Sequence, residues 1–365
     1  MKSVSTKFYG FLFAIFVMGT LLISLPALSA LAASPFKETT YSTPQGFDPW
    51  GTTTDKKGNV WVAVPGCDPT PTCPSGTPPG EIETIQPSTG KWIQTLTLPA
   101  GYAQPFFLAF DKQGRLWFPL PMGNAIGMFN PANNSFAQWT VPTSNAGPWD
   151  LAIDGQGNIW FTEHFVNKIG RFNPTTHAFT EIATPASDSQ PYGITLDASG
   201  NVWFTENNPS VALIAEYTKQ GHLNEYKVRN SYDSSLTPHL ITVDPSRNIW
   251  WTEGFVGMIG ELHIVQAVPG TNNGVTEYPY PRLCSACGMH TSGIGVDKGN
   301  RSIWFDDSLQ NSYGFFPYSG KGSFTMQEAP GYTSNPHPHD GLMVDRQGHI
   351  WFDEEFANKL VRVIY

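Results

Sequence analysis

Residues 147–185 read GPWDLAIDGQGNIWFTEHFVNKIGRFNPTTHAFTEIATP, and this stretch decides the fold. Its frame is a proline with an aromatic residue, a short apolar run ending in Asp, a turn containing Gly, and then Trp-Phe. Residues 190–228 repeat the frame as QPYGITLDASGNVWFTENNPSVALIAEYTKQGHLNEYKV, and the two repeat tryptophans, Trp160 and Trp203, are 43 positions apart. A period of about 40–50 residues is typical of a four-stranded propeller blade.

The repeat tryptophan marks seven copies along the chain. It recurs at Trp61, Trp117, Trp160, Trp203, Trp250, Trp304 and Trp351. In the copy at 147–185 we expect strands over 150–154, 158–164, 168–174 and 178–185, with a hairpin turn at DGQG. Gly and Pro recur too often for long helical periodicity. The sequence therefore predicts an all-β fold, a seven-bladed β-propeller of four-stranded antiparallel blades.

The chain ends are expected to close the ring. The last copy stops after its third strand, at NKLVRVIY (358–365), and lacks a fourth. Residues 36–44, FKETTYSTP, resemble the fourth strand AFTEIATP of the third copy. We expect this N-terminal strand to pair with the last blade, so that residues 33–365 form a single propeller domain.

Residues 1–32 have the features of a signal peptide. Two lysines precede an apolar run, and Ala30-Leu31-Ala32 fits a small-residue cleavage site. The sequence thus predicts a secreted or extracytoplasmic protein. If the segment is not cleaved, it could instead anchor the protein, because the apolar run over 8–25 is nearly long enough to span a bilayer.

The charge of the chain excludes some classes of partner. The formal charge is −9, and removal of Lys2 and Lys7 with the leader takes it to −11. Such a chain lacks the basic surface that binds nucleic acid or an anionic membrane. We expect a monomer that acts on a small molecule, without nucleic acid and without a membrane after signal cleavage.

The four cysteines form two close pairs, Cys67 with Cys73 and Cys284 with Cys287. In an exported chain, such pairs predict two local disulfides. The alternative, a four-cysteine zinc site, would need two pairs from distant parts of the chain to meet in space.

The innermost strand of each blade lines the central channel, so its first residue is expected to face the axis. Counting back from the strand-ending Asp, these candidate substrate-binding residues are Trp50, Phe106, Trp149, Tyr192 and His239. Blades six and seven do not fit this count. Their extra residues place His290, and then His337 and His339, near the same entrance.

Carboxylates recur three positions after the repeat tryptophan. They are Glu163, Glu206, Glu253, Asp307 and Glu354, and we expect them to bond backbone between neighbouring blades. One position further on, only blade seven has a carboxylate, Glu355, which makes it the better functional candidate. Asp340, next to His339, is a candidate substrate contact.

Histidines near this entrance suit two kinds of chemistry. A neutral imidazole can act as a general base near neutral pH or as a metal ligand. We predict that His337, His339, Glu355 and His290 converge at the channel mouth and form a divalent-metal site, with His337 and Glu355 as ligands.

The blade sequence GPWDLAIDGQGNIWFTEHFVNKIGRFNP closely resembles that of the streptogramin B lyases (virginiamycin B lyases), and the likeness covers nearly all of the mature chain. The resemblance implies a seven-bladed propeller that opens a cyclic depsipeptide by elimination at an ester, without water and with magnesium. The family site consists of a Pro-His entering blade six, a Glu-Pro-His entering blade seven, and a Glu four positions after the tryptophan of blade seven.

The site residues match the family pattern in part. The resemblance assigns His339, in HPH, as the catalytic base and Glu355 as the late glutamate, while His290 in CGMHTSG is a looser match without the proline. His337 stands where the family has Glu, and loss of this hard oxygen ligand admits zinc or copper in place of magnesium.

Three functions are therefore open. The first is a carbon–oxygen lyase that uses His339 as base. The second is another propeller metalloenzyme, such as a lactonase, an ester hydrolase or an enzyme with a histidine-rich metal site. The third is a binding propeller without catalysis. The fold cannot choose among them, because one fold supports many functions.

Overall fold

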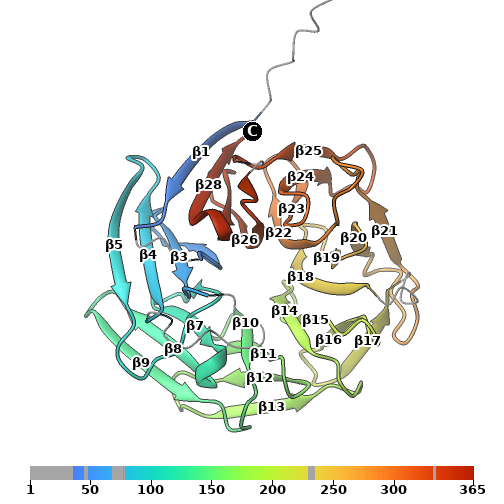
Figure 1. The fold of residues 1–365 in the computed structure, drawn as a ribbon. Coiled ribbons are helices and arrows are strands. Elements are labelled where there is room, and N and C mark those ends of the chain that lie inside the picture. Colours follow the sequence, from blue (N-terminus) through green and yellow to red (C-terminus); the bar gives the residue numbers. More distant parts are fainter. Residues whose placement is uncertain (1–35, 45–47, 68–76, 78, 229–234, 332–333) are drawn as a thin grey trace, which may run out of the picture. The chain divides into compact units, whose positions relative to one another are not determined.

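The computed structural model describes residues 36–44, 48–67, 77, 79–228, 235–331 and 334–365. Residues 36–365 form one compact unit in which seven four-stranded antiparallel sheets are arranged in a ring (Figure 1). This arrangement confirms the predicted all-β, seven-bladed propeller. In the described residues, no helix is long and apolar enough to cross a membrane. The predicted signal peptide, residues 1–32, and Cys73 of the first cysteine pair lie outside the described residues.

Each of the first four blades consists of strands that follow one another in the chain. Blades one and two contain β2 (Thr52–Thr54), β3 (Val60–Val64), β4 (Glu81–Gln86), β5 (Lys91–Thr97), β6 (Ala109–Phe110), β7 (Leu116–Leu120), β8 (Ala125–Asn130) and β9 (Ser135–Thr140). Blades three and four contain β10 (Pro148–Ile153), β11 (Ile159–Glu163), β12 (Lys168–Phe172), β13 (Phe179–Ala183), β14 (Pro191–Leu196), β15 (Val202–Glu206), β16 (Leu213–Tyr217) and β17 (Leu223–Lys227).

The remaining blades follow the same order until the last one. Blades five and six contain β18 (Thr237–Val243), β19 (Ile249–Gly254), β20 (Met258–Leu262), β21 (Val275–Pro279), β22 (Thr291–Asp297), β23 (Ser302–Asp307), β24 (Ser312–Pro317) and β25 (Thr325–Glu328). Blade seven contains β26 (Pro338–Val344), β27 (Ile350–Glu354), β28 (Lys359–Ile364) and β1 (Lys37–Ser42). Short 3-10 turns occupy Pro121–Gly123 and Glu355–Ala357.

The repeated Asp and Trp of each blade are joined by a hydrogen bond. In six blades the indole Nε1 of the repeat tryptophan donates to the carboxylate of the Asp that ends the inner strand, over 2.9–3.3 Å. The same carboxylate, for example that of Asp154, accepts the backbone N–H groups of Gln156 and Asn158 in the turn. One side chain therefore shapes the turn and fixes the tryptophan, which explains why the two residues recur together.

Blade six departs from this rule. Its hairpin turn is one residue longer, and Asp297 accepts from Asn300 Nδ2 at 2.7 Å instead. Within the described part of the chain, the buried Nε1 of Trp304 has no hydrogen-bond partner.

Strand β1 closes the ring. It pairs antiparallel with β28 over six residue pairs, from Lys37 with Ile364 to Ser42 with Lys359, and the two strands lie side by side in Figure 1. Phe36, just before β1, packs edge-on against Trp304 of blade six. The expectation that residues 36–44 complete blade seven is confirmed.

The core lies between the blades, where the faces of neighbouring sheets meet. Trp160 of blade three, for example, belongs to one buried cluster with Ile194 and Phe204 of blade four. Burial of such large side chains stabilises the ring by roughly 25 cal/mol per Å² of apolar surface. The blades thus form a rigid wall around the channel onto which the inner strands project their first residues.

Candidate active site

Seven side chains, one from each blade, form a closed ring around the channel. They are Trp50, Phe106, Trp149, Tyr192, His239, His290 and His339. The centroids of neighbouring rings lie 4.7–5.5 Å apart all the way round, and Trp50 meets His339 to complete the circle. The structure thus brings the five predicted channel residues together with the two predicted catalytic histidines.

The last two histidines reach the ring although their spacing differs from that of the other blades. The strand-ending Asp follows the ring residue by five positions in blades one to five, but by seven after His290 and by six after His339. Blades three to six all shift register by one residue in the inner strand, and His290 lies just before β22, whereas in blade seven the shift between His339 and Met343 is two residues. A count along the sequence therefore misses positions that the fold makes equivalent.

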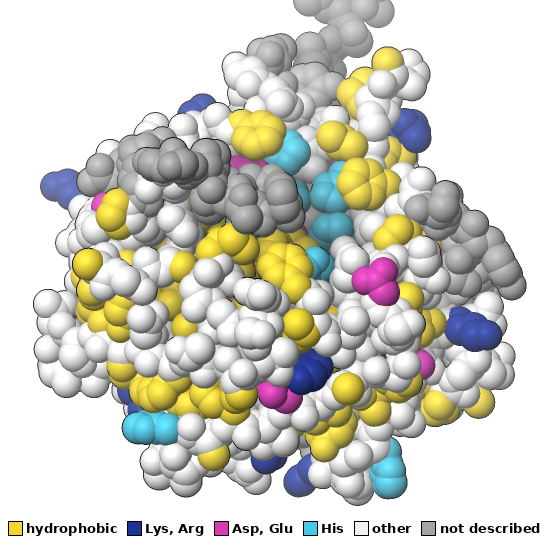
Figure 2. Space-filling view, turned by 60° about the horizontal axis from the view of Figure 1, so that its bottom comes forward, with side chains coloured by type: hydrophobic (Ala, Val, Ile, Leu, Met, Phe, Trp, Pro, Cys, Tyr) yellow, Lys and Arg dark blue, Asp and Glu magenta, His cyan; other side chains and the backbone are white. Residues whose placement is uncertain are grey.

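Four imidazoles follow one another along the histidine side of the ring. The centroid distances are 4.8 Å from His239 to His290, 5.5 Å from His290 to His339, and 5.4 Å from His339 to His337. Figure 2 shows histidine side chains gathered along a hollow of this face, with apolar side chains beside them. Burial lowers the pKa of His239, and burial with the neighbouring imidazoles holds the pKa values of His290 and His339 well below the ordinary range. These three rings are neutral near pH 7 and can accept protons.

The ring of His339 lies beside a buried carboxylate. Its Nδ1 is 3.8 Å from Asp340 Oδ2, and the edge of the imidazole faces Trp50. The same Asp340 carboxylate accepts a hydrogen bond from the Tyr192 hydroxyl, across the channel from blade four. Asp340, predicted as a substrate contact, is therefore engaged by Tyr192 and positioned to stabilise positive charge on His339.

His337 and Glu355 meet at the rim of the mouth. The distance from His337 Nε2 to Glu355 Oε2 is 3.7 Å, and the Glu355 N–H donates to the His337 carbonyl at 3.2 Å. His337 has a left-handed backbone with φ of 56°, which is held by a bond from its N–H to Asn311 Oδ1 at 2.9 Å. Phe356 stacks on the imidazole at 4.1 Å. A strained backbone of this kind, which costs about 1–3 kcal/mol, is typical of functional sites.

The donors at this mouth bear on the predicted divalent-metal site. In the described residues, no group of three or more His, Cys, Asp or Glu side chains is arranged to hold a metal ion. The rings of His290, His339 and His337 follow one another with interplanar angles of 26° and 29°. One imidazole and one carboxylate also make a poor set for Mg²⁺, which prefers oxygen ligands in octahedral geometry. His337 and Glu355 do lie close together, and a metal site with these two residues as ligands stays a prediction.

His290 is fixed by groups of its own blade. Its Nδ1 lies 2.9 Å from the hydroxyl of Ser308, and its N–H donates to Asp307 Oδ1 at 3.1 Å. Asp307 was expected to link neighbouring blades, and it instead anchors the catalytic candidate of its own blade. Ser308 occupies the same repeat position as Glu355, which is a signal in the sequence that the prediction did not use.

The other recurring carboxylates do not bond backbone as expected. Within the described part of the chain, the buried oxygens of Glu163 and Glu206 accept no hydrogen bond from a backbone N–H. They face Glu181 and Glu225 on the fourth strands of their blades, and burial together with these neighbouring carboxyl groups raises the pKa of Glu163 and of Glu206 to about 8. These pairs keep a proton in the folded state at neutral pH.

Two further buried aspartates lie next to the site, and the sequence analysis passed over them. Asp306 and Asp353 stand two positions after the repeat tryptophan and accept the N–H groups of Gly293 and Gly341, each at 2.8 Å. Burial raises the pKa values of both well above the ordinary range. Blades three to five have a threonine at this position, namely Thr162, Thr205 and Thr252. The change from Thr to Asp in the two histidine blades is the signal that could have found them.

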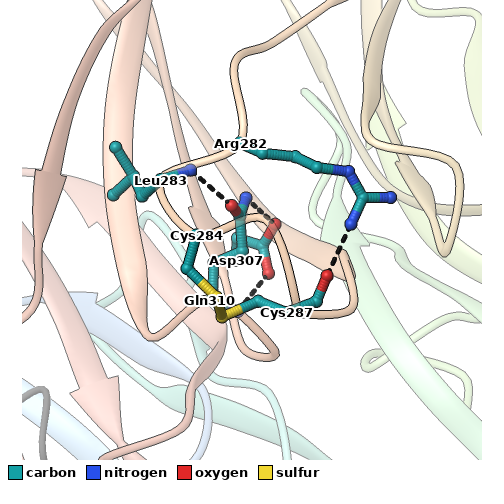
Figure 3. The surroundings of a disulfide bond; sticks show 6 residues. All are labelled: Arg282, Leu283, Cys284, Cys287, Asp307 and Gln310. Carbon is teal, nitrogen blue, oxygen red and sulfur yellow. Dashed lines mark hydrogen bonds between the residues drawn. A yellow bond between two sulfur atoms is a disulfide. The ribbon is translucent and has the colours of Figure 1, made fainter.

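The loop that leads to His290 carries the second predicted disulfide. Cys284 and Cys287 are joined, with an S–S distance of 1.96 Å, which confirms this pairing (Figure 3). The Leu283 N–H donates to Gln310 Oε1 at 2.8 Å, and Gln310 Nε2 donates to Asp307 at 2.8 Å. The disulfide loop is thus tied to the same aspartate that anchors His290.

Two cavities among the described residues lie away from the histidines. Their volumes are about 360 Å³ and 780 Å³, and both are lined by residues of the Asp-containing turns at the opposite ends of the inner strands. Neither is lined by a predicted site residue, so they offer no alternative centre for the chemistry.

The fold and the ring together define a seven-bladed propeller with a row of neutral histidines at the mouth of its channel. The chain belongs to the virginiamycin B lyase family, which matches residues 91–365. This match agrees with the resemblance carried by the blade sequence. No curated protein is significantly similar to the chain.

Solved structures of this family share the fold. Selenomethionine-substituted virginiamycin B lyase from Staphylococcus aureus is 24% identical, with a TM-score of 0.74, over 90% of this chain and 99% of that one. A streptogramin B lyase is 22% identical, with a TM-score of 0.73, over 90% and 97%. A catalytically inactive virginiamycin B lyase from Staphylococcus aureus, crystallised with quinupristin, is 25% identical, with a TM-score of 0.74, over 90% and 99%.

Proposed function

We propose that this chain is an exported carbon–oxygen lyase that opens the ester bond of a cyclic depsipeptide or related lactone by elimination. The observation that carries the proposal is the meeting of His290 and His339, two neutral imidazoles 5.5 Å apart, in a member of the virginiamycin B lyase family. The 25% identical relative crystallised with quinupristin makes streptogramins the first class to test.

His339 is the base in this proposal. It removes the acidic hydrogen on the carbon next to a carbonyl, which requires a neutral ring at ordinary pH. The electron pair of the C–H bond becomes a new carbon–carbon double bond, and the neighbouring C–O bond breaks with its pair on the ester oxygen. Asp340, 3.8 Å from Nδ1, favours the imidazolium that forms.

His290 serves the departing oxygen. Its Nδ1 faces the Ser308 hydroxyl, which can accept or donate, so the ring proton can sit on Nε2 and donate a hydrogen bond to the ester oxygen as it leaves as a carboxylate. The products are an unsaturated residue and a free carboxylate, and no water is consumed. His339 ends the step as an imidazolium while His290 keeps its proton, so loss of one proton from His339 to solvent restores the site.

The rest of the mouth binds the substrate. Trp50, Phe106 and Trp149 form a wall for the apolar part of a bulky ligand. We assign to His337 and Glu355 the binding of polar groups at the rim. The resemblance implies magnesium, or zinc or copper with the extra histidine, but no three-ligand group lies among the described residues, and the steps above do not require a metal.

The test uses quinupristin in ¹⁸O-labelled water, with products followed by mass spectrometry. We expect an unsaturated product without label in the released acid, and loss of turnover in His339→Ala but not in the exposed control His222→Ala. Labelled acid would indicate ester hydrolysis and exclude the lyase. Binding without turnover would indicate a non-catalytic propeller. When the same assay is run with a chelator, we expect an unchanged rate. Loss of activity with the chelator and its recovery on addition of Mg²⁺ would contradict a mechanism without a metal.

Export and a monomeric state are part of the proposal. They rest on the features of residues 1–32 and on the closed ring, in which β1 completes the last blade. Sequencing of the mature N-terminus and sedimentation of the purified protein test both. A start at Met1, or a stable dimer, would contradict them.

A further inference from the structure

His239 is not used by the steps above, yet it belongs to the same ring. Its imidazole is 7% exposed and lies 4.7 Å from the ring of Tyr192 and 4.8 Å from that of His290. The family pattern places histidines only at blades six and seven, so His239 of blade five adds a third imidazole to the channel wall.

A glycine, Gly254, leaves the space in which His239 and His290 lie against each other. The position four residues after the repeat tryptophan carries a side chain in the blades on either side, with Asn207 in blade four and Ser308 in blade six, whereas blade five has Gly254. A Cβ on Gly254 would lie 2.5 Å from Thr237 Oγ1 and 3.0 Å from both His239 Nδ1 and His290 Cδ2. Real Cβ atoms do not approach other atoms this closely, so the pair of rings depends on glycine here.

The hydrogen bonds of His239 fix its tautomer. Its Nδ1 lies 3.0 Å from the carbonyl oxygen of Thr237, which can only accept, so Nδ1 carries the proton. Asn207 Nδ2, 3.2 Å from the same nitrogen, donates one of its two N–H groups to the Pro238 carbonyl at 2.9 Å, and Thr237 Oγ1 lies 3.4 Å from Nδ1, so the Thr237 carbonyl is the nearest partner. The unprotonated Nε2, at the far end of the ring, is therefore the atom that His239 presents to the channel.

In the described part of the chain, neither neighbouring side chain of the ring donates a hydrogen bond to the Nε2 of His239. No hydrogen bond joins the His239 and His290 rings, which meet edge to face at 86°. The hydroxyl of Tyr192, on the other side, donates to Asp340. A ligand that fills the channel beside His239 must supply the donor or leave a buried acceptor unpaired, which is costly.

We propose that His239 determines substrate specificity by accepting a hydrogen bond, through Nε2, from an N–H or O–H of the substrate residue that bears the ester. This inference rests on the proposed function and narrows its substrate class. It favours depsipeptides in which that residue carries a secondary amide, and it disfavours simple lactones and N-alkylated analogues. His239 stays neutral because burial lowers its pKa, so it remains an acceptor through the neutral range.

The test compares two synthetic cyclic depsipeptides that differ in one group. The threonine that bears the ester carries an N–H amide in one compound and an N-methyl amide in the other. We expect the wild type to prefer the N–H compound by about tenfold or more in kcat/KM, as for loss of one buried hydrogen bond. In His239→Phe, which keeps an aromatic ring, the ratio should fall to within about twofold. His222→Phe, the same change at an exposed histidine, should keep the wild-type ratio.

Two readouts separate this inference from the proposed function. Nitrogen NMR of the ligand-free protein should show His239 protonated on Nδ1, and protonation on Nε2 would overturn the inference whatever the activity. If neither compound is turned over, their dissociation constants are compared by calorimetry. A preference for N–H that disappears in His239→Phe and weakens in Gly254→Ala supports His239 even if the lyase proposal fails. Equal affinities, or no binding of either compound, would overturn it.

Discussion

Tyr192 donates its hydroxyl to the carboxylate of Asp340, 148 positions further along the chain, and so connects blade four with blade seven across the channel. Asp340 is almost fully buried and also lies beside the Nδ1 of His339. One hydrogen bond therefore couples the aromatic side of the ring to the proposed base on the opposite side.

Replacement of Tyr192 by Phe should weaken turnover more than binding. The change leaves a buried carboxylate without its hydroxyl donor, which costs about 1–3 kcal/mol. We expect a fall in kcat of about tenfold with a smaller change in KM, together with a lower free energy of unfolding in urea. Tyr217→Phe, in an outer strand of the same blade, is the matched control. Equal losses in the two variants would show that the bond to Asp340 has no special role.

The pH dependence of kcat/KM should reflect a base that is hard to protonate. Burial and the neighbouring imidazoles lower the pKa of His339 below its ordinary value of 6.5, so the ring stays neutral as the pH falls through 6.5. We expect kcat/KM to be constant near pH 7 and to decline only at lower pH, with a midpoint below 6.5. A midpoint at or above 6.5 would argue against His339 as the base.

The free energy of unfolding should fall as the pH rises because of the buried Glu163. Its pKa is about 8 in the folded protein against 4.5 ordinarily, so the folded state holds a proton that the unfolded chain has released between these values. Stability is therefore lost as the pH rises from 4.5 towards 8. We expect Glu163→Gln to raise the melting temperature by about 2 °C or more at pH 8, with little effect at pH 5. The exposed Glu328→Gln should change it at neither pH, and a Glu163→Gln effect of equal size at both would contradict the raised pKa.

Loss of the Cys284–Cys287 bridge should affect the site more than the fold. A bridge between residues three positions apart closes a very short loop, so its removal costs about 2 kcal/mol at most. The loop leads directly to His290, however, and Asp307 is tied to both. We expect the double Ser variant to unfold with a slightly lower midpoint while kcat/KM falls several-fold. A stability loss without any loss of kcat/KM would show that the loop does not hold His290.

The propeller architecture could be predicted because the same local sequence motif recurs in every blade. The Asp–Trp pair recurs since one carboxylate both shapes the turn and binds the indole, and this rule needs only spacing to be found. Closure of the ring by β1 could also be predicted, because the last copy lacks a fourth strand and the N-terminal segment resembles the fourth strand of another blade.

The site was only partly accessible from the sequence. His290 lies just before its inner strand and His339 precedes a two-residue register shift, so spacing alone could not make these positions equivalent to Trp50. The prediction that Glu163 forms hydrogen bonds with the backbone was wrong for another reason. Its partner, Glu181, comes from the fourth strand, and nothing local indicates that two carboxyl groups will face one another there. The metal site stays a prediction, because the sequence indicates which side chains converge but not whether three of them are arranged as ligands.

The pairing of β1 with β28 also sets the order in which this molecule can be assembled. Blades one to six are built from strands that are neighbours in the chain, so each can form as soon as its own residues have been synthesised. Blade seven joins Lys37 to Ile364, and such a non-local contact forms slowly because a long loop must first be closed. His337, His339 and Glu355 belong to this blade, and its four-stranded sheet is complete only after β1 has paired with β28.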